Sequence, residues 1–267
     1  MRVLELAVTA MIASSILASC RFPPPPDIEE DAEDQDASTT DGAPADASDD
    51  GGQLDGSGPA RASGIVVAYD FSEQNGTNIL DRSGVPVACH LTAQSSASLA
   101  WMSKGVTVTS ATTIKNMSAC DKVIAGCASR VTVEAWIKPA SSSQTGTIFA
   151  LESGSGRAFA LLQVGTNLSA RIQTSLVSQV PLTNFGSVSQ IAFVYDGTSL
   201  FTYENGVPLM STVARGSVDP PLDAVLTVSN NLAGTLPWLG ELHFLGVYCR
   251  GLTAKEIEQN YAAGPRL

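Results

Sequence analysis

Short apolar runs separated by turn residues fill the sequence from residue 65 to residue 267. Apolar and polar residues alternate within most runs, and Gly, Asn, Asp or Ser interrupts the pattern before the next run begins. Successive side chains of a β-strand point to opposite faces of a sheet, so this period of two predicts strands with one buried face. The number and spacing of the runs predict an all-β sandwich of two packed antiparallel sheets. The segment is long enough for one such domain.

The clearest group of strands is QIAFVYDGTSLFTYENGVPLMSTV, at residues 190–213. Asp196-Gly197 and Asn205-Gly206 divide it into three apolar stretches. Both dipeptides suit a type I′ turn, because its two central residues need positive φ angles. The segment therefore predicts a three-stranded meander.

A further clear strand is VTVEAWIKP, at residues 131–139. Its alternation places Val131, Val133, Ala135 and Ile137 on one face, and Thr132, Glu134, Trp136 and Lys138 on the other. Pro139 ends this strand because proline cannot donate to a ladder. Other strands are predicted at 65–71, 87–93, 147–151, 158–164, 167–173, 224–229 and 239–249.

One short helix is predicted near the end of the chain. Thr253 and Glu256 have the T-x-x-E spacing of a capping box, in which each residue satisfies a free amide at the helix start. Gly264 allows a left-handed stop, and Pro265 prevents the helix from continuing.

The first twenty residues resemble an export signal. Arg2 precedes an apolar stretch from Leu6 to Leu17, and small residues lead to Cys20. Leu17-Ala18-Ser19-Cys20 resembles the lipobox of bacterial lipoproteins, in which the signal (1–19) is removed and the cysteine is acylated. The alternative is an ordinary signal peptide with an incidental cysteine. Arg21 follows the cysteine in place of an aspartate, which in Gram-negative lipoproteins implies sorting to the outer membrane.

Residues 20–64 have the composition of a disordered tether. They are rich in Pro, Asp, Glu, Ala, Ser and Gly, and they contain too few large apolar residues to form a core. Twelve acidic residues from Asp27 to Asp55 stand against only Arg21 and Arg61, so the tether carries most of the formal charge of −11. No basic patch stands out anywhere in the chain, which argues against a nucleic-acid partner.

Four segments of the remaining domain, 65–267, resemble a known family. They are VVAYDFSEQNGTNILDRSG, VTVEAWIKP, FVYDGTSLFTYENG and GELHFLGVYCRGLTAKEIEQNYAAG, in this order. Together they resemble the laminin-G-like, concanavalin A-type jelly-roll domains of bacterial exported proteins. The match is weakest from Ala97 to Gly126. The resemblance implies a jelly roll whose first and last strands pair, and it implies binding of glycans or proteins, in some members with calcium at the rim.

The domain contains four cysteines, which predict disulfides in an exported chain: Cys89, Cys120, Cys127 and Cys249. Three connectivities are possible. The short spacing favours a small loop closed by Cys120 and Cys127, which leaves Cys89 to pair with Cys249, as the resemblance allows. The spacings lack the CxxC pattern typical of zinc ligands, so no metal site is predicted from the cysteines.

No catalytic residues are predicted. Glycoside hydrolases of this broad fold carry paired carboxyls on one strand, whereas the strand acids here occur singly, as Glu134, Glu204 and Glu241. His90 and His243 lie on predicted strands near the two ends of the domain and are interpreted as structural. The chain is therefore predicted not to be an enzyme.

Binding residues are the remaining candidates. Asp70, Asp81, Asp196 and Asn205 are possible oxygen ligands for calcium, although turns account for most of them. Three tryptophans are possible platforms for a sugar, with core packing as the alternative: Trp101, Trp136 and Trp238.

The sequence thus leads to a hypothesis with two alternatives. The hypothesis is an exported, lipid-anchored, non-catalytic recognition module at the outer membrane or cell surface that binds a glycan or a cell-envelope protein. The alternatives are a structural or adhesion component of the envelope and a glycoside hydrolase with an unfamiliar site.

Overall fold

The computed structural model describes residues 59–173, 175–213 and 217–267. The predicted signal segment, Cys20 and the acidic part of the tether lie outside these residues. The described part belongs to one compact unit, which runs from Leu54 to Leu267. No helix within it is long and apolar enough to cross a bilayer.

Within the described residues, sixteen strands form two antiparallel sheets of eight strands each, as predicted. Sheet A has the order β14 (Val207–Val213), β13 (Ser199–Glu204), β12 (Ser189–Tyr195), β7 (Val131–Pro139), β16 (Gly240–Tyr248), β5 (Gly105–Val108) and β4 (Leu99–Met102), with β1 (Ile65–Tyr69) also paired to β16. Sheet B has the order β11 (Ser175–Pro181), β10 (Asn167–Ile172), β9 (Arg157–Val164), β8 (Thr145–Glu152), β15 (Val225–Val228), β6 (Ile114–Asn116), β3 (Leu91–Ala93) and β2 (Asn78–Ile79).

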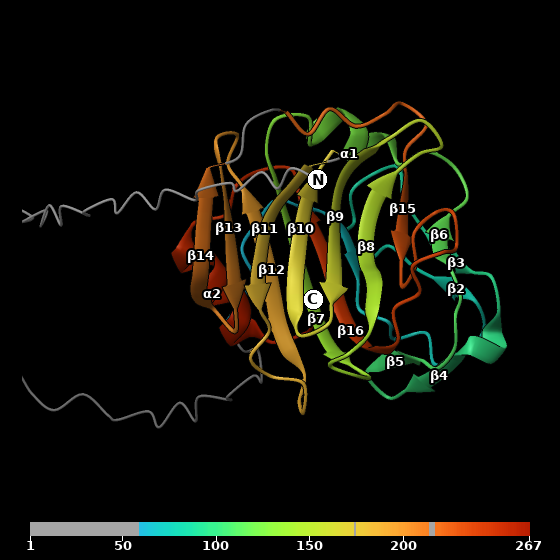
Figure 1. Ribbon diagram of the computed structural model, residues 1–267. Helices are drawn as coiled ribbons and strands as arrows, with labels where there is room; N and C mark the ends of the chain where they lie inside the picture. The colour runs from blue at the N-terminus through green and yellow to red at the C-terminus, as the bar shows by residue number, and fades with distance from the viewer. Residues whose placement is uncertain (1–58, 174, 214–216) are drawn as a thin grey trace, which may run out of the picture. The chain divides into compact units, whose positions relative to one another are not determined.

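The two sheets pack face to face around a single main core. In Figure 1 strands β8, β9 and β10 of sheet B lie in front of β7 and β16 of sheet A. Val133 and Leu245 from sheet A and Phe149 and Leu161 from sheet B belong to the same buried cluster. Alternate side chains of each strand enter this layer, which is the usual construction of a β-sandwich.

The first and last strands of the domain pair, as the resemblance implied. Ala68 of β1 lies opposite Gly246 of β16, and the two strands are antiparallel. Residues 65–69 and 245–248 are therefore held together although most of the domain separates them in sequence. This pairing brings both ends of the domain to one side of sheet A.

The predicted meander forms as β12, β13 and β14. Asn205 and Gly206 both have positive φ, at 52° and 79°, as a type I′ turn requires. The other turn differs from the prediction, because only Gly197 has positive φ there. Asp196 instead accepts hydrogen bonds from the backbone amides of Thr198 and Ser199, so its side chain shapes the turn.

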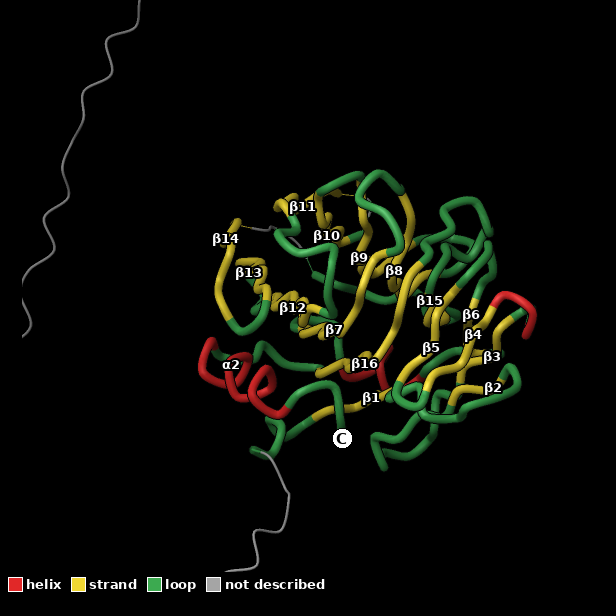
Figure 2. The backbone as a smooth tube through the Cα atoms, turned by 90° about the horizontal axis from the view of Figure 1, so that it is seen from below, coloured by secondary structure: helices red, strands yellow, loops and turns green. Residues whose placement is uncertain are grey.

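Helix α2 (Ala254–Ala263) begins with the predicted capping box between Thr253 and Glu256. It ends at Gly264, whose φ is 75°. In Figure 2 it lies against sheet A, on the side away from sheet B. Ile257 of α2 packs there with Val194 and Tyr248 in a second, smaller cluster.

The segment with the weakest resemblance contains most of the elements that the sequence patterns missed. Between residues 96 and 126 the chain forms a short 3-10 turn (Ser96–Ser98), three short strands (β4, β5 and β6) and helix α1 (Asp121–Gly126). Strands of three or four residues carry too little alternation to be recognised. β2 and β11 were also not predicted, and β3 covers only the last part of the range 87–93.

The four cysteines form two disulfides, but the pairing differs from the one that the spacing favoured. Cys89 pairs with Cys120, and Cys127 pairs with Cys249, with Cα–Cα distances of 5.7 Å and 4.3 Å. Helix α1 occupies the segment between Cys120 and Cys127. Because a helix rises about 1.5 Å per residue, those two cysteines end up on the order of 10 Å apart, beyond the reach of a disulfide.

Non-reducing peptide mapping tests this pairing. Trypsin separates all four cysteines, because a Lys or Arg lies between each of them and the next. We expect peptide 83–104 to be linked to 116–122, and peptide 123–130 to be linked to 216–250. A linked pair of 116–122 with 123–130 would contradict the structure, and reduction before digestion serves as the control.

Candidate functional site

The outer face of sheet A points away from sheet B. Helix α2 covers one part of this face, and the other part is open. Strand β7 runs through both, with Thr132, Glu134, Trp136 and Lys138 on this face. Residues 131–137 and Pro139 are buried on both faces of the strand, while Lys138 is half-buried. The polar alternation of this strand therefore marks a face that lies against α2 rather than against solvent.

The covered part is centred on Glu134, whose side chain is fully buried. Its Oε1 accepts from Arg61 Nη1 at 2.7 Å, Trp136 Nε1 at 2.9 Å and Gln190 Nε2 at 3.0 Å, and its Oε2 accepts from Asn260 Nδ2 at 2.8 Å. A buried charge is tolerated only when it is paired and hydrogen-bonded, and Glu134 meets both conditions. Its lone pairs are engaged, so it is poorly placed to act as an acid, base or nucleophile.

Tyr248 borders the same cluster from β16. It accepts a hydrogen bond from Asn260 Nδ2 at 3.0 Å. Burial, with a further contribution from the nearby Glu134 carboxylate, raises the pKa of Tyr248 to about 12. The phenol is therefore neutral over the whole physiological range.

The structure buries two of the three tryptophans considered as sugar platforms. Trp238 is fully buried and donates to Gln163 Oε1 at 2.8 Å. Trp136 is 7% exposed and stacks on Tyr261 of α2, with ring centroids 5.7 Å apart. Trp101 is half-buried at the edge of the core, and its Nε1 donates to Gly76 O at 3.2 Å. Of the three, Trp101 alone keeps a substantial part of its surface accessible.

The open part begins where β16 changes partners. Its first residues pair with β5 and its last with β1, and an irregularity falls between Leu242 and Phe244. His243 occupies this position, with Nδ1 2.7 Å from Lys104 O and Nε2 3.0 Å from Glu241 Oε2. Both neighbours are hydrogen-bond acceptors, and each lies within reach of one ring nitrogen of His243.

Glu241 links His243 to β7. Its Oε1 accepts from Lys138 Nζ at 2.9 Å. Burial raises the pKa of Glu241, but the hydrogen bonds from Lys138 and His243 outweigh it and hold the pKa below its ordinary value. Lys138, Glu241 and His243 thus form a hydrogen-bonded row across the open part of the sheet.

A groove with a volume of about 610 Å³ lies beside this row. We call it the sheet A groove. Its walls are Asp70 and Ser72 after β1, residues 102–104 of the β4–β5 hairpin, His243, and the tail 265–267 that follows α2. Its volume falls within the range typical of small-molecule sites. Six of its lining residues are polar or charged, and Met102, Pro265 and Leu267 provide apolar surface.

The four side chains considered as calcium ligands all accept hydrogen bonds within the protein. Asp81 Oδ1 accepts from the amides of Ala68 and Ser83, and its Oδ2 accepts from the Cys89 amide and from Lys122 Nζ at 2.5 Å. Burial raises the pKa of Asp81, but these hydrogen bonds outweigh it and lower the pKa.

The other three candidate calcium ligands also accept hydrogen bonds from nearby residues. Asp70 accepts from Ser72, Asp196 shapes its hairpin turn, and Asn205 Oδ1 accepts from the Gln190 amide. His90 lies just before β3, and its Nδ1 accepts from the Asp81 amide at 3.0 Å. In the described ranges, no three His, Cys, Asp or Glu side chains gather as a metal site would require.

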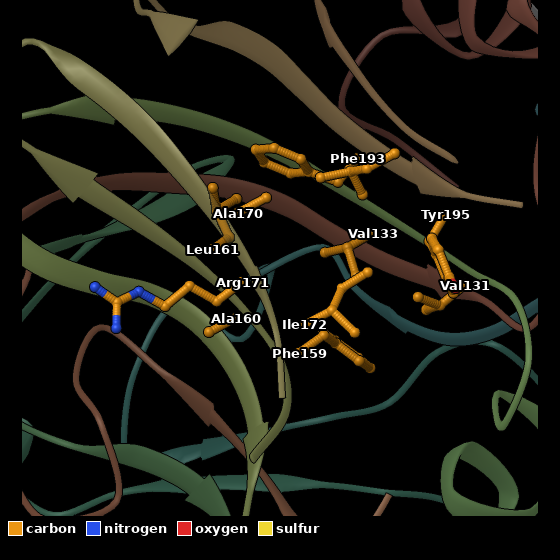
Figure 3. A pocket seen from close by; sticks show the side chains of 11 residues that line it. Val131, Val133, Phe159, Ala160, Leu161, Ala170, Arg171, Ile172, Phe193 and Tyr195 are labelled. Carbon is orange, nitrogen blue, oxygen red and sulfur yellow. The ribbon is translucent and has the colours of Figure 1, made fainter. Parts of the chain in front are cut away.

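A smaller pocket lies between the two sheets (Figure 3). Val133, Phe193, Phe159 and Ile172 gather there, whereas Arg171 points away from them. Its volume of about 20 Å³ is enough for roughly one water molecule, and its walls are apolar. It is a packing defect of the core and not a ligand site.

The sequence of the domain matches a model of a known protein family. The model described as the concanavalin A-like lectin/glucanases superfamily matches residues 110–258, which is more than half of the chain. The chain belongs to this superfamily. The two-sheet antiparallel fold described above is the one expected for a concanavalin A-like domain. None of the curated proteins compared with the chain matches it.

Solved structures with this fold occur in several larger proteins. The concanavalin A-like domain superimposes on a Trypanosoma rangeli sialidase with a TM-score of 0.58 and 14% identity, covering 75% of this chain and 33% of that one. The binding domain of botulinum neurotoxin serotype D/C gives a TM-score of 0.60 and 10% identity, with coverage of 74% and 51%. The chain thus spans about a third of the sialidase and half of the toxin domain.

A third neighbour matches over almost its whole length. Domain 4 of AbnA, an extracellular arabinanase from Geobacillus stearothermophilus solved in complex with arabinotriose, gives a TM-score of 0.57 and 18% identity, covering 74% of this chain and 98% of that one. At these identities the likeness shows the fold alone.

The role of Asp81 is testable through its charge. We expect Asp81→Asn to lower the free energy of unfolding by about 3 kcal/mol at pH 7, because it leaves buried Lys122 without its partner. The folded-state pKa of Asp81 lies below the unfolded one, so its contribution is present above the unfolded value of about 3.9 and is lost as the pH falls through the folded pKa.

Urea unfolding of both proteins between pH 7 and the lowest pH at which both fold measures this difference. The difference in free energy of unfolding between the two proteins should become smaller as the pH falls below about 5. Asp223→Asn, which changes an exposed aspartate, is the matched control and should leave stability nearly unchanged. A gap that stays constant with pH would show that the Asp81 charge is not responsible.

Proposed function

We propose that this chain is a non-catalytic recognition module that binds a saccharide in the sheet A groove. The observation that supports this most directly is the groove itself, an open site whose backbone framework is fixed by the pairing of β16 with β5 and β1. A preformed site on rigid strands keeps its polar groups in place and lowers the entropy lost on binding.

The lining suits the chemistry of a sugar. A saccharide presents hydroxyl groups, which need donors and acceptors, and patches of C–H, which need apolar contact. Polar partners include Ser72, Ser103, Lys104 and His243. Apolar contact comes from Met102, Pro265 and Leu267. Among the described residues, the Lys104 ammonium has no hydrogen-bond partner, so it is free to meet a ligand oxygen.

Three carboxylates on strands of sheet A support binding without turnover. Glycoside hydrolysis needs two carboxyls that face each other across the scissile bond. Glu134 is saturated by four donors, Glu241 bridges Lys138 and His243, and Glu204 binds Thr183. Each of the three is engaged within the protein, on its own part of the sheet.

The disulfides indicate an exported domain, since such bonds persist in oxidising compartments. We further propose that acylated Cys20 anchors the chain to a membrane and that the acidic tether after it acts as the spacer. Each buried methylene of an acyl chain adds about 0.8 kcal/mol of membrane affinity, so one cysteine with several chains is a firm anchor.

An adhesion or structural role is the second candidate, and one surface favours it. Edge strand β14 exposes Val207, Leu209 and Met210, at 60%, 36% and 41%. Apolar side chains on an exposed edge are suited to a protein partner rather than to a sugar. Retention of an envelope protein that is lost in Leu209→Lys, with no glycan bound, would favour this role.

A glycan array, read with and without calcium, tests the leading proposal. We expect specific signals that Lys104→Ala and His243→Gln each weaken at least tenfold, which corresponds to about 1.4 kcal/mol of binding free energy. Lys115→Ala changes a lysine on sheet B and should leave the signals unchanged. An array without signals at high protein concentration, or signals that survive both groove variants, would contradict the proposal.

The anchor is tested by detergent phase partitioning of bacterial extracts. We expect the wild-type chain in the detergent phase with incorporated labelled palmitate, and Cys20→Ala in the aqueous phase without label. The conservative control is Ser19→Ala, which leaves the acylated residue in place. Equal partitioning of the wild type and Cys20→Ala would indicate an ordinary signal peptide.

A further inference from the structure

We propose that Arg61 is a positioning residue for the sheet A groove. It holds the tail 265–267, which forms one wall of the groove. Arg61 thereby couples this wall to the segment that joins the tether to the domain. This inference rests on the groove being the ligand site. Arg61 lies outside the groove lining, yet it determines the shape of the site.

The Arg61 guanidinium makes four contacts at once. Its Nη1 pairs with Glu134 Oε1 at 2.7 Å, its Nε donates to Arg266 O at 2.6 Å, and its Nη2 donates to Gly264 O. Its carbon centre lies 3.9 Å from the ring centroid of Phe244. The side chain is 8% exposed, so these contacts are shielded from water.

These contacts attach the tail to the sheet. Within the described ranges, the other backbone hydrogen bonds of Gly264 and Arg266 go to near neighbours, from Gly264 N to Tyr261 O and from Arg266 N to Gly264 O. Among the described residues, the donors that reach their carbonyls from outside the helix and tail belong to Arg61. Because Pro265, Arg266 and Leu267 line the groove, the position of its wall depends on this one side chain.

Glu134 fixes the guanidinium in turn. Gln190 from β12 and Asn260 from α2 hold its carboxylate, so the orientation of Arg61 is set by sheet A and by the helix together. The chain of contacts therefore runs from the sheet through Glu134 and Arg61 to the tail. No link in it depends on a side chain that lines the groove.

Lysine cannot reproduce this arrangement. An ammonium group carries the charge needed for Glu134, but it lacks the planar fork that reaches a carboxylate and two carbonyls while it stacks on Phe244. Arg61→Lys therefore separates the two tasks of the residue: it keeps the ion pair, and it releases the tail.

Arg61 also belongs to the segment that enters the domain. The Ala62 amide donates to Asn260 Oδ1 at 2.7 Å, and Gln259 Nε2 donates to Ala60 O at 2.6 Å. Residues 60–62, in the last part of the predicted tether, thus lie along α2. Coupling between two sites is reciprocal. A ligand that stabilises this position of the tail therefore also stabilises the packing of residues 60–62 on α2.

Hydrogen exchange measured by mass spectrometry on the full chain tests the proposal without any ligand. In Arg61→Lys we expect the amides of the peptide over residues 259–267 to exchange at least tenfold faster, while those of β7 and β12 keep their rates. Arg157→Lys alters another arginine–glutamate pair, on sheet B, and should leave the tail unchanged. Unchanged tail exchange in a folded Arg61→Lys protein would overturn the proposal.

A second variant covers the case in which Arg61→Lys does not fold. Truncation after Gly264 keeps Arg61 and its ion pair, and it removes the wall. We expect the Ala62 amide and its neighbours to exchange at least tenfold faster, because the coupling acts in both directions. No change there would likewise overturn the proposal.

Neither result depends on a saccharide, so failure of the groove to bind one is a separate outcome. Where the glycan array gives signals, Arg61→Lys should weaken them at least tenfold while Arg157→Lys leaves them intact. Array signals that are unchanged in Arg61→Lys would overturn the positioning role and leave the proposed function standing.

Discussion

The buried carboxylate of Glu134 is the constraint on which this side of the molecule depends. A charge in the middle of a covered sheet face must have partners, and no neighbour on β7 except Trp136 supplies one. The partners come from β12, from α2 and from the segment that enters the domain. One acidic side chain thus requires three distant parts of the chain to meet, and it fixes where the terminal helix must lie.

The strands were predictable from the sequence because their signals are local. Alternation located β7, β12, β13 and the pairing partners β1 and β16, and capping chemistry located α2. Local signals do not tell whether a polar face is open, however. Glu134 and Trp136 alternate as solvent-facing residues would, and only the fold shows that α2 covers them. The same limit applies to Cys120 and Cys127. Their short spacing favoured a disulfide-closed loop, but helix α1 lies between them and holds them apart.

The candidate site was less accessible to prediction for a related reason. Its walls come from residues after β1, from a hairpin at 102–104, from β16 and from the tail, and each contribution is one to three residues long. His243 was read as a structural strand residue, and Lys104 and Arg266 carried no signal at all. The position of His243 depends on an irregularity in β16 that arises where the strand changes partners, and such an event leaves no pattern in the sequence.

The two disulfides determine what a proteolytic cut does to the domain. Cys127–Cys249 encloses most of both sheets in one covalent ring, and Cys89–Cys120 closes a second ring directly before it. A protease that cuts any loop between residues 128 and 248 opens the ring without releasing a fragment. The severed ends stay on one molecule, and the strands on either side can remain paired. In the oxidising compartments where such bonds persist, a single cut therefore leaves the two parts of the domain covalently joined.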